Sequence, residues 1–169
     1  IYIYIHTASL QLRILHKSCI HIVAEQVVAT PSFDSDTGRY TLVLEQSCAP
    51  SPGQPQKAPF HIPVAIGLVD RDTGEDIVGT QVLELREAAE TFTFELGKRS
   101  QAPTLSLLRD FSAPVKVTVK GQSQADLAFL MGADHDSFVR WDSGQTIATS
   151  VILGLVADVI AGRSLVLES

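Results

Sequence analysis

The hydrophobic pattern changes its period within residues 111–145, and this change constrains the fold more than any other feature of the chain. Before it, apolar and polar residues alternate, as they do in strands that bury one face. After it, apolar residues recur about every 3.6 positions, which is the spacing of a helix. A strand entered through Pro114 leads through a turn at 121–124 into helical sequence that holds Trp141, the only tryptophan. The sequence therefore predicts a β part joined to a helical part.

The β part consists of six or seven short apolar segments separated by turn signals. Asp-Gly turns occur at 34–38 and 70–74, and residues 49–59 form a proline-rich loop. Such spacing predicts an immunoglobulin-like β-sandwich. Pro63 lacks a backbone donor, so we expect it at an edge or bulged position. The predicted strands lie at 27–33, 40–44, 60–70, 81–85, 91–96, 105–108 and 115–119.

The helical part is predicted to contain two helices. Ser123 and Asp126 have the spacing of a capping box, and Asp134 or Asp136 can cap the second helix. Apolar residues occur all round residues 147–160, which is typical of a helix buried on several sides. One small sandwich cannot cover such a helix, so we expect the chain to stop inside a helical domain that continues.

These patterns predict a mainly β fold with C-terminal α structure, an immunoglobulin-like sandwich followed by two helices. We expect an atypical N-terminal segment at 1–26, the sandwich at 27–121 and the truncated start of a helical domain at 122–169. Residues 1–26 have strand-like composition without a clear amphipathic plan, so they are doubtful as ordinary coding sequence.

Composition excludes several classes of function. The 169 residues carry a formal charge of −6 with no basic tract, which argues against nucleic acid and anionic membrane surfaces as partners. No uninterrupted apolar run reaches the length of a membrane span. Cys19 and Cys48 offer one possible pair, and we expect unpaired thiols. No basic residue precedes the apolar start, so a secretory signal is not predicted, and cytoplasm or an organelle is favoured over secretion.

For each candidate site, the sequence supports a structural role better than a chemical one. The two Asp-x-Asp-Thr-Gly segments lack the later bidentate acid of a calcium loop and are predicted to be turns. His61 is expected on an outer strand face, and His135 at a helix start in a capping or surface role. Arg140 and Asp142 could pair beside Trp141. Neither a His-Glu-x-x-His motif, a phosphate loop nor a nucleophile elbow occurs, so no catalytic, cofactor-binding or metal residue is predicted.

Several segments agree in order with one known family. Residues 29–165 contain DSDTGRYTLVLEQ, PFHIPVAIGLVD, ETFTFEL, LLRDFSAPVKV, DLAFLM and DSFVRWDSGQ. In order and spacing they resemble the zinc aminopeptidase N (alanyl aminopeptidase) family, at its immunoglobulin-like third domain and the first helices of its fourth. Residues 1–26 do not resemble what that family has there.

The resemblance implies a role without chemistry of its own. That family removes N-terminal residues from peptides with one zinc ion, held by a His-Glu-x-x-His motif beside a Gly-x-Met-Glu-Asn anchor in an upstream domain. This chain has neither motif, so we expect no cofactor in it and no activity from it alone. Its expected partners are the remaining domains of a parent aminopeptidase. Two alternatives stay open: a free-standing immunoglobulin-like binding module, and self-association through the C-terminal helix.

Overall fold

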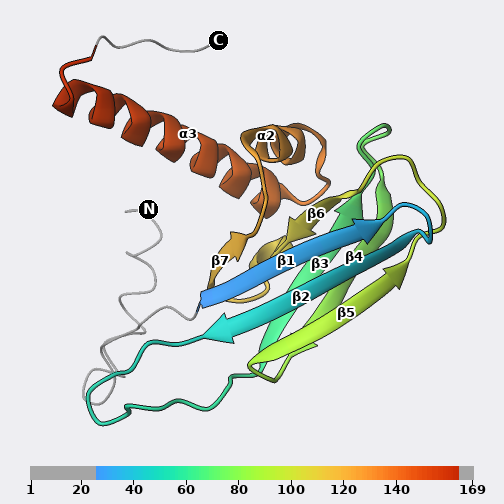
Figure 1. The fold of residues 1–169 in the computed structure, drawn as a ribbon, viewed down its shortest axis with the longest axis horizontal. Helices are drawn as coiled ribbons and strands as arrows, with labels where there is room; N and C mark the ends of the chain where they lie inside the picture. Colours follow the sequence, from blue (N-terminus) through green and yellow to red (C-terminus); the bar gives the residue numbers. More distant parts are fainter. Residues whose placement is uncertain (1–25, 164–169) are drawn as a thin grey trace.

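The computed structural model describes residues 26–163, which form two β-sheets and two α-helices (Figure 1). The elements in chain order are β1 (Gln26–Asp34), β2 (Arg39–Ser47), β3 (Ile62–Val69), β4 (Asp76–Leu85), β5 (Ala89–Glu95), β6 (Thr104–Leu107), the 3-10 turn η1 (Arg109–Phe111), β7 (Lys116–Val119), α2 (Gln124–Ala133) and α3 (Ser137–Ile160). Apart from Gln26, the atypical N-terminal segment lies outside the described residues.

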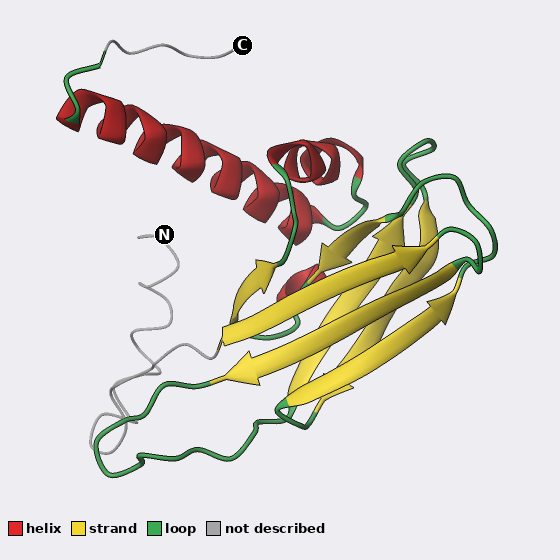
Figure 2. Ribbon diagram, in the orientation of Figure 1, coloured by secondary structure: helices red, strands yellow, loops and turns green. Residues whose placement is uncertain are grey.

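The strands form a sandwich of two sheets. One sheet has the order β5-β2-β1-β7 and the other β4-β3-β6, and Figure 2 shows both layers with the helices at one end. Neighbouring strands are antiparallel except β1 and β7, which are parallel. The predicted fold class, an immunoglobulin-like sandwich followed by two helices, is confirmed.

The core lies between the sheets and follows the period of two read from the sequence. In β2, Tyr40, Leu42 and Leu44 are buried, while Arg39 and Glu45 are exposed. Each buried aliphatic or aromatic side chain contributes about 1.5–3 kcal/mol before chain entropy is subtracted. Both sheets supply the core, whose other buried members are Val27, Ala29, Ile62, Val64, Ile66, Leu68, Leu83, Leu85, Leu105, Leu108 and Ala113.

The position of Pro63 differs from the prediction, and the strand pairing explains why proline is tolerated there. Its strand, β3, is the central strand of its sheet, so the prediction of an edge strand is wrong. However, β6 pairs only with residues 66–69 of β3, which leaves the Pro63 end without a strand on that side. Ala65 N donates to Ser112 Oγ at 2.9 Å there. Because N–H groups two residues apart in a strand point the same way, the donor missing at Pro63 falls on this unpaired side.

The two helices cover part of the outer face of the three-stranded sheet. Val69 of β3 is buried with Leu130 of α2 and Val139 of α3 in a second apolar cluster. The predicted capping box begins α2, because Ser123 Oγ accepts from Asp126 N at 3.2 Å and Ser123 N donates to the Asp126 carboxylate at 2.7 Å. The helices therefore start where the sequence places them and are attached to the sheet by both apolar and polar contacts.

The far half of α3 leaves the sandwich and is uncovered (Figure 1). Its exposed apolar residues are Val151, Ile152, Leu153, Val156, Val159 and Ile160. Over 18 residues the mean hydropathy of α3 reaches 1.5 with 6% of that window buried, so by length and composition alone it could cross a membrane. The sequence predicts no span here, because polar residues interrupt the apolar run. Core helices of soluble proteins pass the same length and composition test, so this property alone assigns no membrane.

Candidate functional site: the junction between the sandwich and the helices

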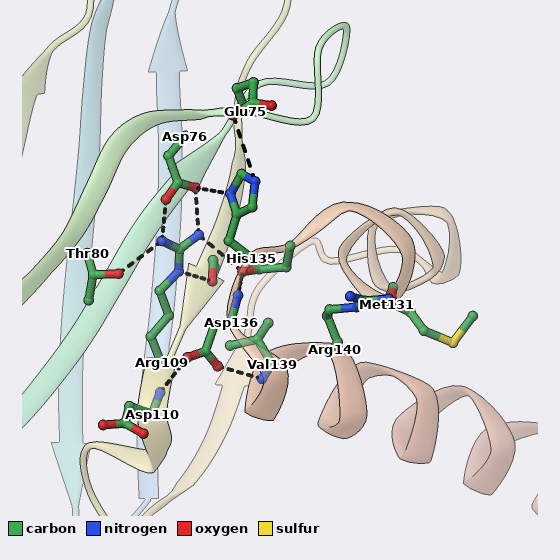
Figure 3. A network of polar contacts seen from close by, with 12 residues as sticks. Glu75, Asp76, Thr80, Arg109, Asp110, Met131, His135, Asp136, Val139 and Arg140 are labelled. Carbon is green, nitrogen blue, oxygen red and sulfur yellow. Dashed lines mark hydrogen bonds and ion pairs between the residues drawn. The ribbon is translucent and has the colours of Figure 1, made fainter.

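Arg109 lies at the centre of the junction, in the turn that follows β6. Three of the residues around it have left-handed backbone conformations: Leu108 at φ 58°, Asp110 at φ 55° and Phe111 at φ 50°. L-residues rarely adopt this region, and each such residue costs on the order of 1 kcal/mol or more. The turn is maintained at that cost, and it places the Arg109 side chain against the outer face of the three-stranded sheet (Figure 3).

The Arg109 guanidinium is 2% exposed and uses each of its nitrogens. Nη1 and Nη2 donate to the two oxygens of Asp76 at 2.6 and 2.7 Å, a bidentate pair. Nε donates to Ser106 Oγ at 2.7 Å, and Nη1 also donates to Thr80 Oγ1 at 3.1 Å. Nη2 donates to Asp134 Oδ1 at 3.2 Å. One side chain thereby connects β4, β6 and the end of α2.

The charges of this group shift one another's titration. Hydrogen bonds from Arg109 hold the pKa of Asp76 below its usual value, and the Asp76 pair raises the pKa of Arg109. Fork-to-fork arginine–carboxylate pairs are among the stronger hydrogen bonds in proteins. Removing one partner of a buried pair leaves an uncompensated charge and costs about 3–5 kcal/mol. Loss of either Arg109 or Asp76 alone is therefore expected to destabilise the fold strongly.

A relay of carboxylates continues from Arg109 to the start of α3. Asp134 Oδ1 also accepts from Asp136 N at 2.8 Å. Asp136 caps α3, accepting from Val139 N at 2.8 Å through Oδ1, and accepts from Asp110 N at 2.9 Å through Oδ2 (Figure 3). The orientation of α3 is thus coupled to the strained turn and, through Arg109, to the sheet.

Gly67 of β3 provides the space that Arg109 occupies. A Cβ atom at this position would lie 2.2 Å from Arg109 Cζ, much closer than real Cβ contacts. The glycine is therefore required by the close approach of a side chain rather than by backbone conformation. The junction depends on a missing methyl group on one strand and a guanidinium from another element.

Aromatic and cationic contacts surround the polar network. The Phe111 and Phe138 rings lie 5.1 Å apart between η1 and α3, and the Phe138 and Trp141 rings 6.1 Å apart. Arg71 forms an ion pair with Asp126 of α2. The Arg71 guanidinium also lies 5.9 Å from the centroid of the Phe129 ring. These contacts attach α2 and α3 at separate points, which restricts rotation of the helices on the sheet.

The two Asp-x-Asp-Thr-Gly segments are turns, as predicted. Asp34 Oδ1 accepts from Asp36 N at 2.9 Å and Thr37 N at 3.3 Å, and Gly38 has φ 73°. Hydrogen bonds from Thr37 lower the pKa of Asp34. In the second turn Asp70 makes the same bonds to the amides of residues 72 and 73, and their hydrogen bonds lower the pKa of Asp70. In both turns the aspartate carboxylate accepts hydrogen bonds from the backbone amides of the turn.

The remaining candidate residues do not come together as a reactive site. His61 lies directly before β3 and is exposed, with Nε2 3.8 Å from Glu84. His135 is also exposed, with Nε2 3.7 Å from Glu75 and Nδ1 4.0 Å from Asp76. Arg140, which could have paired with Asp142, instead donates from Nε to the Met131 carbonyl at 3.1 Å. The thiol of Cys48 accepts from Lys57 Nζ at 3.3 Å, whereas Cys19 lies outside the described residues.

Zinc, which the family resemblance implies for a parent enzyme, does not fit these residues. Across residues 26–163, no three His, Cys, Asp or Glu side chains lie close enough to hold a metal ion. The carboxylates that are closest together, at the junction, are engaged by Arg109 and by backbone amides. We therefore assign no step of peptide hydrolysis to the described part of the chain.

Sequence reasoning missed Arg109. Its partners lie far along the chain, 33 residues away for Asp76 and 25 for Asp134, so no local spacing reveals them. One signal was available: a charged Arg-Asp pair directly after two leucines at the end of a buried strand. Arginine and aspartate are almost never fully buried unless they are paired, so a charge this close to core positions indicates a possible buried ion pair.

The fold and junction define an immunoglobulin-like sandwich to which a helical segment is firmly attached. Residues 25–120 match the family described as a domain of unknown function (DUF3458) with an Ig-like fold. Residues 124–168 match the family described as a domain of unknown function (DUF3458_C) with ARM repeats. Since the first match covers more than half of the chain, the chain belongs to the DUF3458 Ig-like family.

The relatives of this segment are aminopeptidases. Aminopeptidase N of Escherichia coli (strain K12) is 35% identical over 133 residues, covering 75% of this chain and 15% of the relative. Aminopeptidase N of Haemophilus influenzae is 30% identical over 130 residues, covering 72% and 14%. A crystal structure of Legionella pneumophila aminopeptidase A in complex with aspartic acid matches with a TM-score of 0.67 and 27% identity, covering 86% and 15%.

The chain thus spans about 15% of the length of these relatives. The resemblance to the aminopeptidase N family is confirmed, and the described segment is a domain of the aminopeptidase N type.

The space beside Gly67 gives a first prediction. Gly67→Ala should destabilise the fold by about 1–3 kcal/mol, because the new methyl group displaces the buried guanidinium. Urea denaturation of the purified chain measures this loss. Gly79→Ala on the neighbouring strand is the control, since nothing lies within 4 Å of its Cβ position. We expect a change below about 1 kcal/mol there, and equal effects of the two variants would contradict the role of Gly67.

The buried pair gives a second prediction, which depends on pH. Arg109→Met should cost about 3–5 kcal/mol at pH 7 and Arg109→Lys less, because lysine keeps the charge but loses the fork. The pKa of Asp76 in the folded protein lies below the unfolded value of 3.8. The stabilisation is therefore present above pH 3.8 and is lost as pH falls through the lower, folded value.

Denaturation curves at several pH values should thus show the wild-type and Arg109→Met stabilities converging in acid. Arg39→Met is the control, because Arg39 and Glu95 form a pair whose side chains are 57% and 62% exposed. That variant should lose less than about 1 kcal/mol. A difference between wild type and Arg109→Met that stays constant down to acid pH would argue against a charge-mediated junction.

Proposed function

We propose that this chain is a non-catalytic scaffold segment of a zinc-dependent aminopeptidase, in which the sandwich, at 27–121, holds the start of a helical domain, at 122–169. In the full-length parent, the activity would be removal of N-terminal residues from peptides by an upstream catalytic domain. The chain itself contributes no catalytic, cofactor-binding or metal residue in this proposal. Its partners are the other domains of the parent.

The observation that carries this proposal is the combination of a rigid junction with an uncovered helix. Arg109 is buried and makes five hydrogen bonds that join the sheet to the end of α2. Asp134 connects this group to Asp136, the cap of α3. Beyond the junction, α3 presents apolar side chains to solvent, up to Ile160 at 82% exposure. Soluble proteins rarely leave a contiguous apolar surface of this kind uncovered unless it meets a partner. The ARM-repeat match of residues 124–168 favours further helices as that partner, because such repeats stack on their neighbours.

The first test concerns catalysis by the chain alone. Purified chain incubated with zinc and alanine p-nitroanilide should release no p-nitroaniline above the blank, because the described residues lack a metal donor set. Escherichia coli aminopeptidase N, assayed in parallel, is the positive control. Turnover that co-purifies with the chain through a second column would overturn the non-catalytic assignment.

The second test concerns the scaffold role. Replacing the matched segment of Escherichia coli aminopeptidase N by this chain should give a soluble chimera that retains peptidase activity, whereas the Arg109→Met chimera should lose soluble, active enzyme because the junction is broken. An Arg39→Met chimera controls for loss of any arginine. An enzyme that stays active after deletion of the whole segment would contradict the proposal and favour the free-standing binding module.

A further inference from the structure

Many of the apolar residues of α3 are arranged in a regular repeat. From Phe138 to Val159, apolar residues and one glutamine follow one another at alternating steps of three and four positions. This is the a and d spacing of a heptad repeat, which keeps side chains in line along one face of a helix. We call this line the heptad seam, and its residues are Phe138, Trp141, Gln145, Ala148, Ile152, Leu155 and Val159. Most of them are large and apolar, as along the contact line of two packed helices.

The heptad seam lies on the side of α3 that faces away from α2 and the sandwich. The opposite face carries Ser143, which is 4% exposed, and Ser150, whose Oγ accepts from Gln124 Nε2 of α2 at 3.3 Å. In the seam, by contrast, Trp141 is 54% exposed and Ile152 is 59% exposed. One face of the helix is thus seated on the described part of the chain, and the face with the seam is free.

An aromatic group continues the seam onto the sandwich. The ring of Phe138, at one end of the seam, lies 5.1 Å from that of Phe111 in η1 and 6.1 Å from that of Trp141. Phe138 also packs against the core of the sandwich, whereas Phe111 is exposed. A helix lying along the seam would therefore contact the sandwich at one end and the uncovered end of α3 at the other (Figure 1).

Two residues in the middle of the seam argue against a second copy of α3 as its occupant. In a parallel pair each seam residue faces its own counterpart, so Ala148 would face Ala148 and leave a gap. In the two antiparallel registers that overlap most of the seam, Gln145 faces Leu155 or Ala148, which leaves its amide without a partner. A helix of different sequence can place a large side chain over Ala148 and a polar one over Gln145. The ARM-repeat match of residues 124–168 also favours such a helix, because these repeats stack on their neighbours.

We infer that the heptad seam binds one α-helix of the parent's helical domain, which packs lengthwise along α3 and reaches Phe111 of the sandwich. That helix carries apolar side chains along its own seam, with a large one over Ala148 and an amide or hydroxyl group at Gln145. The inference rests on the proposed scaffold role, because it names the neighbour to which the sandwich presents α3. Leu153 is 61% exposed but lies at a b position outside the seam, so it contributes little to this contact.

A synthetic helix tests the seam without the parent enzyme. The probe is a tryptophan-free amphipathic peptide of about 21 residues, or three heptads, with leucine at its a and d positions except for one central glutamine. A peptide of the same composition in scrambled order is the control. Trp141 is the only tryptophan of the chain and lies in the seam, so its fluorescence reports binding.

Titration of the purified chain with the helical peptide should move the emission of Trp141 to shorter wavelength and saturate, because the peptide covers its ring. No saturable shift, or the same shift with the scrambled peptide, would overturn the inference.

Two neighbouring residues of nearly equal exposure provide a matched pair of variants. Ile152→Glu puts a charge into the seam and should weaken peptide binding about tenfold or more, because burial of one large aliphatic side chain is lost. Leu153→Glu makes the same change beside the seam and should weaken binding less than about threefold. Both side chains are exposed in the free chain, so both variants should melt like the wild type. Equal losses of affinity in the two variants would refute the seam.

Other outcomes would identify a different occupant. Sedimentation of the chain alone should show a monomer at the concentrations of the titration. A dimer that Ile152→Glu breaks and Leu153→Glu leaves intact would assign the seam to a second copy. A shift of Trp141 emission with phosphatidylcholine vesicles but not with the peptide would assign it to lipid. Either result would overturn the inference and leave the chimera test of the scaffold role unaffected, so the two proposals can fail separately.

Discussion

The buried fork between Arg109 and Asp76 is the interaction on which the arrangement of this segment depends. A guanidinium that is 2% exposed must have its charge compensated, and both Asp76 oxygens meet it at 2.6 and 2.7 Å. Because Asp134 is also a partner of Arg109, the same charge that satisfies the sheet also holds the end of α2. An apolar residue could fill this volume, but it could not specify direction as a fork does. The polar junction thereby fixes where the helices begin.

The strain in the turn that contains Arg109 follows from this geometry. Leu108, Asp110 and Phe111 adopt left-handed conformations that cost on the order of 1 kcal/mol each or more. The turn is retained because its neighbours determine it from several sides: Asp110 N donates to Asp136, and the Phe111 ring lies 5.1 Å from that of Phe138. Strain in a sparsely populated region persists only where the surrounding contacts outweigh it. Here those contacts come from α3, so the turn and the helix stabilise each other.

Local patterns in the sequence predicted much of the fold but little of the junction. Alternation identified Tyr40, Leu42 and Leu44 as core residues, and the Ser123–Asp126 spacing identified a helix start, because both signals act over a few residues. The edge assignment of Pro63's strand failed because β6 pairs with the other end of β3, residues 66–69, and that pairing joins segments distant in sequence. Arg109 could not be placed for the same reason. Its role exists only once three distant segments meet.

The continuity of α3 converts this local junction into a long-range constraint. A helix of 24 residues extends about 36 Å, and its first turns are held by the Asp136 cap, by Val139 in the second apolar cluster and by the Phe138 ring. Because the helix is one hydrogen-bonded rod, fixing its start fixes the direction of its exposed apolar end. Any helical neighbour that covers that end is then oriented relative to the sandwich without touching it. The proposed scaffold role requires that property, and Arg109 contributes to it at the other end of the helix.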